Sequence, residues 1–413
     1  MILGANPETI PIVKKAKDMG LSVIVVDPNQ FSPAKRYADK SFEVDGLNEK
    51  ELIKLGRALS IDAILVGVAD VLIKSYVSVA NNLNLPTYGD KKFISILTNK
   101  QLFSESLNKF GISPIPSYEE QEIYNLKQTD FPLLIKPTDS GGGVGMTICK
   151  KLEDVDKAII KAKNSSLSKK FIAEKFMECD DMGVYITIVN GEAFLSTIAD
   201  RFTSKLQGSL TPVCIGATYP SVHAERFILS VFPRIKKMLK AIGVVNGILN
   251  IQFFYDGKEF YAYDPGFRLQ GEGSHYIMQD INDIDHIEML INFALNGVFD
   301  LDNFKSKNDF MLKNLKAASI WILLKEGKIS KIDGLNQVKS LSSVIKIIQR
   351  FEEGDNITKD MIGNEKQVFA RIYIKDKSFA GIKQTVKFIK DNLKIYDKSG
   401  VSLILDCLSE ENF

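Results

Sequence analysis

A lysine followed by a cluster of glycines is the feature of this sequence that most clearly indicates chemistry. Residues 131–146 read FPLLIKPTDSGGGVGM, and Lys136 ends an apolar run that predicts a buried strand. Four glycines follow after a short polar turn: Gly141, Gly142, Gly143 and Gly145. Glycine lets backbone N–H groups approach an anion without a Cβ in the way, and the lysine adds a positive charge. The segment therefore predicts a polyphosphate site, although it lacks the Gly-Lys-Ser/Thr of the Walker pattern.

Three side chains farther along the chain are suited to a metal ion and a transferring phosphoryl group. Gln252 lies in the middle of one predicted strand, and Asp264 ends the next one. The two strands form a hairpin that turns at Asp256-Gly257, so both side chains reach one point. Oxygen ligands from two strands, completed by phosphate oxygens and water, suit Mg²⁺. Arg268 follows four residues after Asp264, and its planar fork fits a carboxylate or a phosphoryl group.

The first ninety residues alternate short apolar strands with helices. Strands are expected at residues 1–3, 21–26, 41–44 and 63–68, and helices at residues 8–19, 49–59 and 71–83. This alternation predicts a parallel, Rossmann-like sheet. The turn after the first strand reads GANPET rather than GxGxxG, so a nicotinamide dinucleotide site is not supported. Asp27, which ends the second strand, is interpreted as a cap or turn residue.

The rest of the chain has a pattern of hairpins and helices around the glycine-rich segment. Two short helices are expected within residues 93–110 and one long helix at residues 226–243, and the strands at residues 185–189 and 193–200 turn at Asn190-Gly191. The expected division is a Rossmann-like domain over residues 1–92, a central domain over 93–308 with its glycine-loop subdomain at about 130–178, and a smaller C-terminal unit over 309–413.

Composition excludes several classes of function. The chain has 413 residues with 53 Lys and Arg against 51 Asp and Glu, and this balance argues against nucleic acid or a membrane as its partner. The four cysteines form no CxxC pair, so neither a zinc site nor a disulfide framework is predicted. No apolar run approaches the ~20 residues of a membrane span, and the first residues do not resemble a signal peptide. We expect a cytoplasmic protein that acts on small molecules.

Together these segments resemble the ATP-grasp ligases, over nearly the whole chain. The resemblance rests on Lys136 with its glycine loop, on the segment EKFM at residues 174–177, and on the hairpin with Gln252, Asp264 and Arg268. It points to the branch that includes biotin carboxylase, carbamoyl phosphate synthetase and the purine-pathway members. It implies an α/β fold with an N-terminal Rossmann-like domain, a central ATP-grasp domain of two α+β subdomains, and a small C-terminal α+β lid domain.

The resemblance also implies roles for individual residues, with ATP and Mg²⁺, or Mn²⁺ in its place, as cofactors. Lys100 and Lys136 match lysines that contact the phosphates. The loop over the triphosphate and the adenine and ribose contacts match Ser140, Gly141, Gly142, Gly143, Glu174, Lys175, Phe176, Met177 and Asp181, with Asp180 as the alternative for the ribose. Gln252 and Asp264 match the metal ligands. Arg268 matches the arginine that steadies the acyl phosphate, so Arg268 and Lys136 are the expected catalytic residues.

Two residues are candidates for binding the substrate, each with an open alternative. Arg201 lies near where the family receives its acceptor, and it is either a carboxylate anchor or a solvated surface arginine. His275 follows the catalytic strand closely, and it is either a pocket residue or a structural histidine.

The sequence departs from the family pattern at the metal site. Gln252 replaces the glutamate of many members, as it does in carbamoyl phosphate synthetases. Asp264 is one methylene shorter than the usual glutamate, and Gly266 stands where an asparagine ligand is common. The segment LQGEGSHY after Arg268 lacks the valine–glutamate–histidine of biotin carboxylases, which disfavours biotin chemistry.

The function that the resemblance implies is an ADP-forming carboxylate–amine ligase. A carboxylate attacks the γ-phosphorus of ATP, and an amine then attacks the resulting acyl phosphate. The resemblance further implies small-molecule carboxylate and amine substrates and a homodimer. Two alternatives remain open: a purine-pathway ligase of the phosphoribosylglycinamide synthetase or carboxyaminoimidazole ribonucleotide synthetase type, and a nucleotide-binding regulator that has lost turnover.

Overall fold

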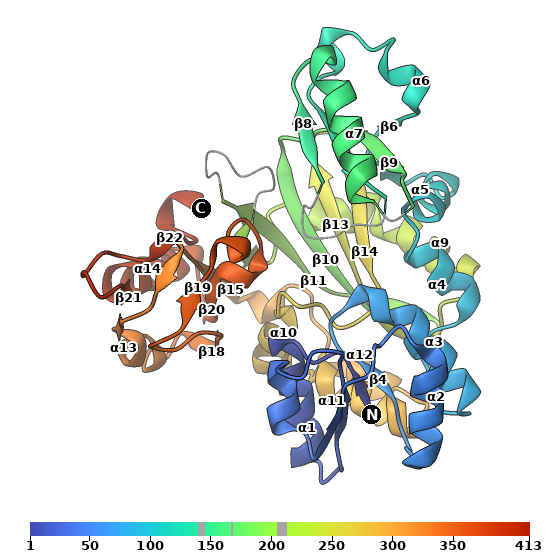
Figure 1. Ribbon diagram of the computed structural model, residues 1–413, viewed down its shortest axis with the longest axis vertical. Coiled ribbons are helices and arrows are strands. Elements are labelled where there is room, and N and C mark those ends of the chain that lie inside the picture. Colours follow the sequence, from blue (N-terminus) through green and yellow to red (C-terminus); the bar gives the residue numbers. More distant parts are fainter. Residues whose placement is uncertain (139–144, 167, 205–212) are drawn as a thin grey trace.

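The computed structural model describes residues 1–138, 145–166, 168–204 and 213–413. The N-terminal part, a subdomain that stands on the central sheet, and the C-terminal part surround a common centre (Figure 1). Four residues predicted for the phosphate loop, Ser140, Gly141, Gly142 and Gly143, lie outside the described residues.

The N-terminal part confirms the predicted parallel sheet. Its strands are β1 (Ile2–Leu3), β2 (Ile24–Val26), β3 (Lys40–Phe42) and β4 (Leu65–Val66), in the order β3-β2-β1-β4. Helix α1 (Ile10–Asp18) connects β1 to β2, α2 (Glu49–Ala58) connects β3 to β4, and α3 (Ile73–Asn82) follows β4. The strand order reverses between β1 and β4, which is where open α/β sheets bind ligands at the carboxyl ends of their strands.

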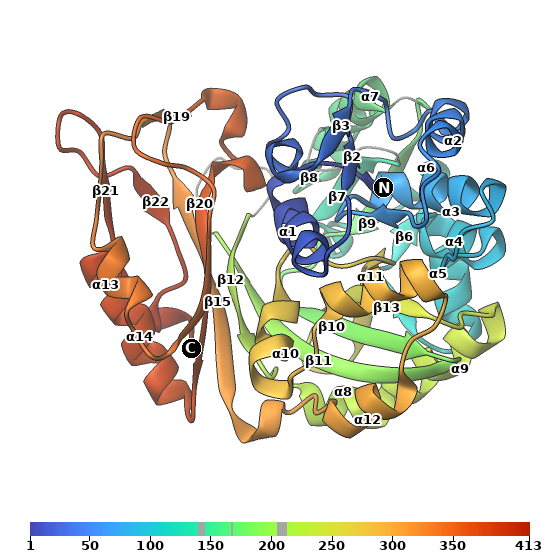
Figure 2. The same ribbon diagram turned by 90° about the horizontal axis from the view of Figure 1, so that it is seen from below.

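The centre of the molecule is a long antiparallel sheet. Its middle strands, in the order β12-β11-β10-β13-β14, are β12 (Cys214–Tyr219), β11 (Glu192–Thr203), β10 (Asp180–Val189), β13 (Gly247–Tyr255) and β14 (Phe260–Gly266), and β5 (Ser113–Pro114) adds to the β14 edge. The predicted hairpin turn is present, with positive φ at Asn190 and Gly191. Helices α8 (Ala224–Ser230), α9 (Phe232–Ile242) and α12 (Leu301–Lys307) lie on the side opposite the N-terminal sheet (Figure 2).

The C-terminal part extends the same sheet. Strand β15 (Lys316–Leu324) pairs with β12, and β20 (Val368–Asp376) and β18 (Val344–Gln349) follow. The smaller elements of this part are β16 (Gly327–Lys328), β17 (Lys331–Asp333), α13 (Leu335–Lys339), β19 (Asn356–Ile357), α14 (Phe379–Asn392), β21 (Lys394–Tyr396) and β22 (Ile404–Asp406). Backbone hydrogen bonds therefore cross the boundary expected at residue 309, and the division into domains stays a prediction.

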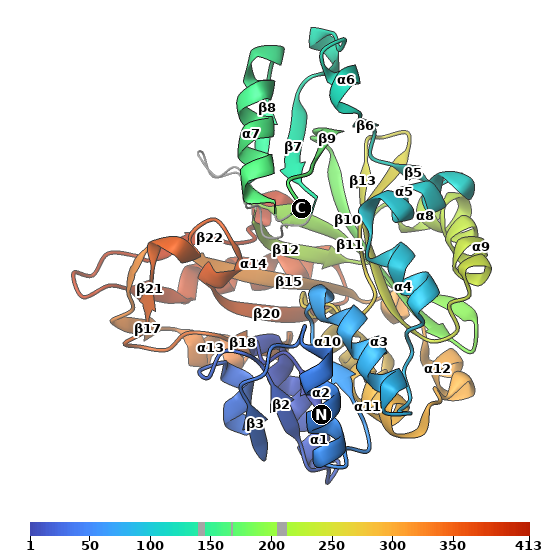
Figure 3. The same ribbon diagram turned by 45° about the vertical axis from the view of Figure 1, so that its right-hand side comes forward.

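A small subdomain with its own apolar core rises from one end of the central sheet (Figure 3). Its strands, in the order β6-β9-β7-β8, are β6 (Ser117–Tyr118), β9 (Phe171–Lys175), β7 (Leu133–Pro137) and β8 (Thr147–Cys149). Helices α6 (Glu120–Ile123) and α7 (Val155–Ser165) complete it. We call this unit the lid sheet; it is distinct from the C-terminal lid domain that the resemblance implies.

The remaining helices confirm one expectation and correct another. Residues 93–110 form two short helices as predicted, α4 (Lys91–Leu97) and α5 (Lys100–Lys109). The prediction of one long helix at residues 226–243 is wrong, because two helices, α8 and α9, are separated at Val231. Pro233 stands at the start of α9, and its missing N–H and its ring are tolerated only in the first turn of a helix. Helices α10 (Ser274–Asn282) and α11 (His286–Asn296) follow β14.

Buried apolar side chains connect the N-terminal part to the central sheet. One large cluster of buried apolar side chains runs from the N-terminal strands through β10 and β13 to α11, and a second fills the C-terminal part. Among the described residues, no helix is long and apolar enough to cross a membrane.

Candidate nucleotide and metal site

The hairpin of β13 and β14 places the two predicted metal ligands opposite each other. Gln252 pairs directly with Asp264, and a bulge follows between Gln252 and Phe253. The side chain of Asp264 is open to solvent, yet burial by surrounding protein raises its pKa. The carboxylate is thus accessible on one side and closely surrounded by protein on the others, and we call its surroundings the recess. This arrangement fits a hard divalent cation, which prefers oxygen ligands.

Both predicted phosphate-binding lysines lie close enough to Asp264 to act on its pKa. Lys100, at the start of α5, has a lowered pKa because of burial and of the positive charge of Lys136, whereas the carboxylates of Asp264 and Glu174 act in the opposite direction. Lys136 also acts on Asp264 and lowers its pKa. Lys100, Lys136 and Asp264 therefore come together from α5, the lid sheet and the central sheet. Two lysines that repel each other favour an anion between them.

Glu174 lies beside Lys136 on the lid sheet. The antiparallel register of β7 and β9 pairs Leu134 with Glu174 and Lys136 with Ile172, so the two charged side chains lie on one face. They form an ion pair, with 11% of the Lys136 side chain and 14% of the Glu174 side chain exposed. The lysine is thus held in place where the lid sheet meets the central sheet.

The segment predicted to contact adenine is the hinge between the lid sheet and β10. Strand β9 ends at Lys175, and Phe176 and Met177 follow it. The backbone N–H of Lys175 donates to the carbonyl of Pro116, and that of Phe176 donates to the carbonyl of Pro132, each at 2.9 Å. These bonds fix the position of the hinge, and the adenine contacts stay a prediction.

Arg268 joins the catalytic hairpin to the N-terminal part. Its guanidinium pairs with the carboxylate of Asp70, from the turn that follows β4, and also donates to the carbonyl of Leu269 at 3.0 Å. The Arg268 side chain is 13% exposed, and that of Asp70 is 51% exposed. Asp70 is close enough to Asp264 to raise its pKa. Sequence reasoning missed Asp70, although its position after β4 at the strand-order reversal indicates a ligand site.

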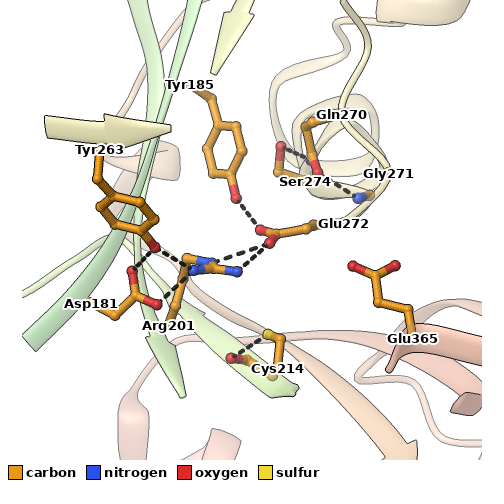
Figure 4. A network of polar contacts seen from close by, with 12 residues as sticks. Asp181, Tyr185, Arg201, Cys214, Tyr263, Gln270, Gly271, Glu272, Ser274 and Glu365 are labelled. Carbon is orange, nitrogen blue, oxygen red and sulfur yellow. Dashed lines mark hydrogen bonds and ion pairs between the residues drawn. The ribbon is translucent and has the colours of Figure 1, made fainter. Parts of the chain in front are cut away.

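Arg201 is the centre of a buried polar network (Figure 4). Its guanidinium donates to Asp181 at 2.6 Å, to Glu272 at 2.7 and 3.1 Å, and to the hydroxyl of Tyr263 at 3.1 Å. Tyr263 donates to Asp181 and Tyr185 donates to Glu272, both at 2.8 Å. The Arg201 side chain is only 10% exposed, so the solvated alternative does not describe it.

The charges of this network support one another. Burial acts to lower the pKa of Arg201, but Asp181 and Glu272 outweigh it, and the pKa lies well above the ordinary value. Burial acts to raise the pKa of Glu272, but Arg201 outweighs it and the pKa is lowered. Arg201 as a carboxylate anchor and Asp181 as a ribose ligand stay predictions. Each role would require one of these ion pairs to open.

His275 lies in the interior rather than at the recess. Its ring lies tilted at 45° to that of Tyr276 at a centroid distance of 4.1 Å, and among the described residues neither ring nitrogen has a hydrogen-bond partner. Burial, with a contribution from His286, lowers the pKa of His275 to about 3. This environment favours the structural alternative, and contact with the substrate stays a prediction.

A second charged cluster links the N-terminal turn after β1 to the C-terminal part. Glu8 accepts from Arg350 and, at 3.0 Å, from Arg371, while Arg371 also donates to Glu365 at 2.8 Å and to the carbonyl of Gly271. Arg371 is 2% exposed and stacks on Trp321, with its guanidinium 4.0 Å from the ring centroid. Sequence reasoning missed this cluster. The available signal was an arginine within an otherwise apolar strand, VFARIYI.

The described residues contain no group of three or more His, Cys, Asp or Glu side chains placed to hold a metal. A cation at Gln252 and Asp264 would therefore take its remaining oxygen ligands from phosphate, water and neutral side chains. This donor set suits Mg²⁺, which commonly binds through one or two carboxylates together with substrate phosphates.

Comparisons with known proteins agree with this geometry. Residues 99–183 match the family model described as carbamoyl-phosphate synthase L chain, ATP binding domain, a span that contains Lys100, Lys136, Glu174 and Asp181. A formate-dependent phosphoribosylglycinamide formyltransferase from Prochlorococcus marinus subsp. pastoris is 25% identical over 362 residues, which are 83% of this chain and 86% of the relative.

Solved structures share the fold over nearly the whole chain. The phosphoribosylglycinamide synthetase from Anaerococcus prevotii is similar with a TM-score of 0.76 and 21% identity, covering 96% of this chain and 98% of that chain. The L-amino acid ligase from Bacillus licheniformis is similar with a TM-score of 0.79 and 17% identity, with the same coverage of both chains.

Proposed function

We propose that the chain is an ATP-grasp enzyme, an ADP-forming ligase that joins a small carboxylic acid to an amine through an acyl phosphate. The match of residues 99–183 to a carbamoyl-phosphate synthase ATP-binding domain and the fold shared with solved ligases support this proposal. One observation carries the proposal: Asp264 lies opposite Gln252 across β13 and β14, and Lys100 and Lys136 are both close enough to act on its pKa. Two lysines and an accessible carboxylate in one place provide for a triphosphate and its cation together.

The residues of the recess perform the chemistry by position and charge. Lys100 and Lys136 neutralise phosphate oxygens as the γ-phosphoryl group moves to the carboxylate of the substrate. Mg²⁺, or Mn²⁺ in its place, held by Gln252 and Asp264, would supply further charge neutralisation. Arg268 lies four residues beyond Asp264 and steadies the acyl phosphate once its pairing with Asp70 opens. No covalent nucleophile of the protein is required.

Asp70 and the arginine pair Arg350 and Arg371 are the groups that would bind the acceptor. Asp70 is half exposed beside Arg268, so its carboxylate can hold an amine close to the acyl phosphate. Arg350 and Arg371 both pair with Glu8, and Arg371 is also close enough to Glu272 to act on its pKa. Paired guanidinium groups suit a carboxylate or a phosphate. An acceptor with an amine at one end and an anionic group at the other fits both sites.

Two acceptor classes follow from these contacts and from the relatives. The relative that aligns over 83% of this chain is named for formate and phosphoribosylglycinamide, a carboxylate and a phosphate-bearing amine, which favours a purine-pathway reaction. The structural likeness to an L-amino acid ligase favours the second class, in which the anionic group is the carboxylate of an amino acid. The arginine pair is compatible with both.

The test is ADP release from ATP over a matrix of carboxylates and amines, with formate and phosphoribosylglycinamide in one row and amino acids in another. One pair should stimulate ADP release well above the rate with ATP alone. ATP binding without stimulation by any pair would support the nucleotide-binding regulator instead.

Lys136→Ala tests the recess directly. Loss of a charge-assisted contact to phosphate should weaken ATP binding by about tenfold to a hundredfold, since such bonds contribute about 1.5–3 kcal/mol. Lys157→Ala, an exposed lysine on α7 of the same subdomain, is the matched control. Unchanged ATP affinity in Lys136→Ala would contradict the placement of the triphosphate.

We also propose a cytoplasmic homodimer that associates through the N-terminal domain, as expected from the sequence. Light scattering coupled to gel filtration measures the mass in solution. A mass near 46 kDa, that of one chain, would contradict the dimer.

A further inference from the structure

Among the described residues, the side-chain oxygen of Asn250 on the catalytic hairpin is buried and accepts no hydrogen bond. Asn250 precedes Gln252 by two residues on β13, so both side chains lie on the same face of the sheet. Leaving a buried acceptor unpaired costs on the order of 1–3 kcal/mol, which is a reason to look for a ligand.

Gly266 makes the space that this amide occupies. Gly266 pairs with Asn250 across the hairpin, next to the pair of Asp264 and Gln252. A Cβ at position 266 would lie 2.5 Å from the Asn250 side-chain oxygen and 3.2 Å from a carboxylate oxygen of Asp70. A side chain at position 266 and the Asn250 amide in its present place therefore exclude each other.

The neighbouring side chains of the hairpin make the Asn250 oxygen a candidate ligand for a divalent cation. Asp264 supplies one carboxylate and Gln252 one neutral amide, which is a weak donor set for a divalent cation. A side-chain amide oxygen is a suitable additional ligand for such an ion. No donor restrains the oxygen of Asn250, and the last torsion of asparagine is broad, so the amide can rotate toward its neighbours on the same face.

We propose that Asn250 contributes its side-chain oxygen to the divalent cation, as a ligand beside Gln252 and Asp264. The inference rests on the proposed function, because it requires a nucleotide-bound cation at this hairpin. An asparagine ligand is common in the family at the position of Gly266. The proposal assigns this role to Asn250 on the paired strand, and the missing side chain at Gly266 leaves room for the Asn250 amide.

The experiment measures Mn²⁺ binding to the full chain with ADP present, by electron paramagnetic resonance of free Mn²⁺. Asn250→Ala should weaken Mn²⁺ binding by about tenfold or more, since even indirect supports of a metal contribute tenfold to a hundredfold. Asn250→Asp retains the oxygen and adds charge, so it should bind Mn²⁺ at least as tightly as the native protein. Affinity for ADP without metal should be the same in all three proteins.

A relocation variant gives a second, independent measurement. Gly266→Asn alone should weaken Mn²⁺ binding, because its side chain collides with Asn250. Combined with Asn250→Ala, the new amide has room, and Mn²⁺ affinity should recover at least in part relative to either single variant. Circular dichroism at each step checks that the fold is retained.

The outcomes separate this inference from the proposed function. Native protein that shows no ADP-dependent Mn²⁺ binding would overturn both. Native protein that binds Mn²⁺, with Asn250→Ala binding equally well, would overturn the role of Asn250 alone. A loss of metal-free ADP affinity in Asn250→Ala that matches its loss of Mn²⁺ affinity would assign Asn250 to a phosphate and would also overturn the inference. If Asn250→Ala does not fold, weaker Mn²⁺ binding by Asn250→Asp than by the native protein would overturn the role of Asn250.

Discussion

Replacement of Arg201 by methionine should lower the stability of the fold, because it removes the guanidinium that lies between the carboxylates of Asp181 and Glu272. Asp181 and Glu272 lie 2.6 and 2.7 Å from the guanidinium, and their side chains are 13% and 17% exposed. Methionine fills a similar volume but neutralises neither carboxylate. Breaking one partner of a buried ion pair costs about 3–5 kcal/mol, because the remaining charge stays in a medium that solvates it poorly.

This cost corresponds to a measurable shift in thermal stability. Unfolding entropy near 60 °C is about 2.1 cal/mol/K per residue, so a loss of about 4 kcal/mol lowers the Tm of the chain by about 4–5 °C when it unfolds as one unit. Circular dichroism melting at pH 7.5 measures the shift. Without Arg201 the pKa values of the two carboxylates rise in the folded state, so the folded variant binds additional protons as pH falls. The difference in unfolding free energy between the variant and the native protein should therefore shrink at lower pH.

The triple variant Arg201→Met, Asp181→Asn, Glu272→Gln tests the reason for the loss. It removes the guanidinium and both charges, so it should recover a large part of the lost stability, as neutral replacements of buried ion networks do. A single variant that loses less than about 1 kcal/mol, or a triple variant no more stable than the single one, would refute the electrostatic reasoning. Either result would mean that packing of the arginine stem determines the effect.

Three further outcomes follow from individual positions. Asp264→Asn should lower kcat by about a hundredfold or more with circular dichroism unchanged, and undiminished turnover in a steady-state ADP-release assay would contradict the metal role. Gly273→Ala should destabilise by about 2–4 kcal/mol in thermal melts, because φ is +86° and a Cβ would lie 2.0 Å from the hydroxyl of Tyr373. The control Gly257→Ala, with φ of +92° and nothing within 4 Å, should lose only about 1 kcal/mol, and equal losses would contradict the steric argument. His275, whose pKa falls from the ordinary 6.5 to about 3, is neutral in the fold while the unfolded chain binds a proton below pH 6.5. Its contribution to stability therefore falls as pH drops below 6.5, by up to about 1.4 kcal/mol per pH unit, so urea unfolding of His275→Phe should depend less steeply on pH between 6.5 and 5, and an unchanged slope would contradict it.

The sequence by itself determined the features that depend on neighbours along the chain. Alternating strands and helices predicted the parallel N-terminal sheet, and the hairpin turn at Asp256-Gly257 already placed Gln252 and Asp264 on adjacent strands. Lys136 was identifiable because it ends an apolar strand directly before a run of glycines. For the hairpin and for Lys136 the relevant partner lies within about a dozen residues, where strand period and turn chemistry set the geometry.

Only the tertiary structure decided which distant charges meet. Arg201 finds Asp181 and Glu272 from positions 20 and 71 residues away, and Glu8 finds Arg371 from 363 residues away. A charged residue in a chain with 53 basic and 51 acidic side chains has many equally plausible partners, and local pattern does not choose among them. The choice follows from how the sheets cross and from what they bury, because a charge removed from water must be paired by whichever opposite charge the fold brings to it.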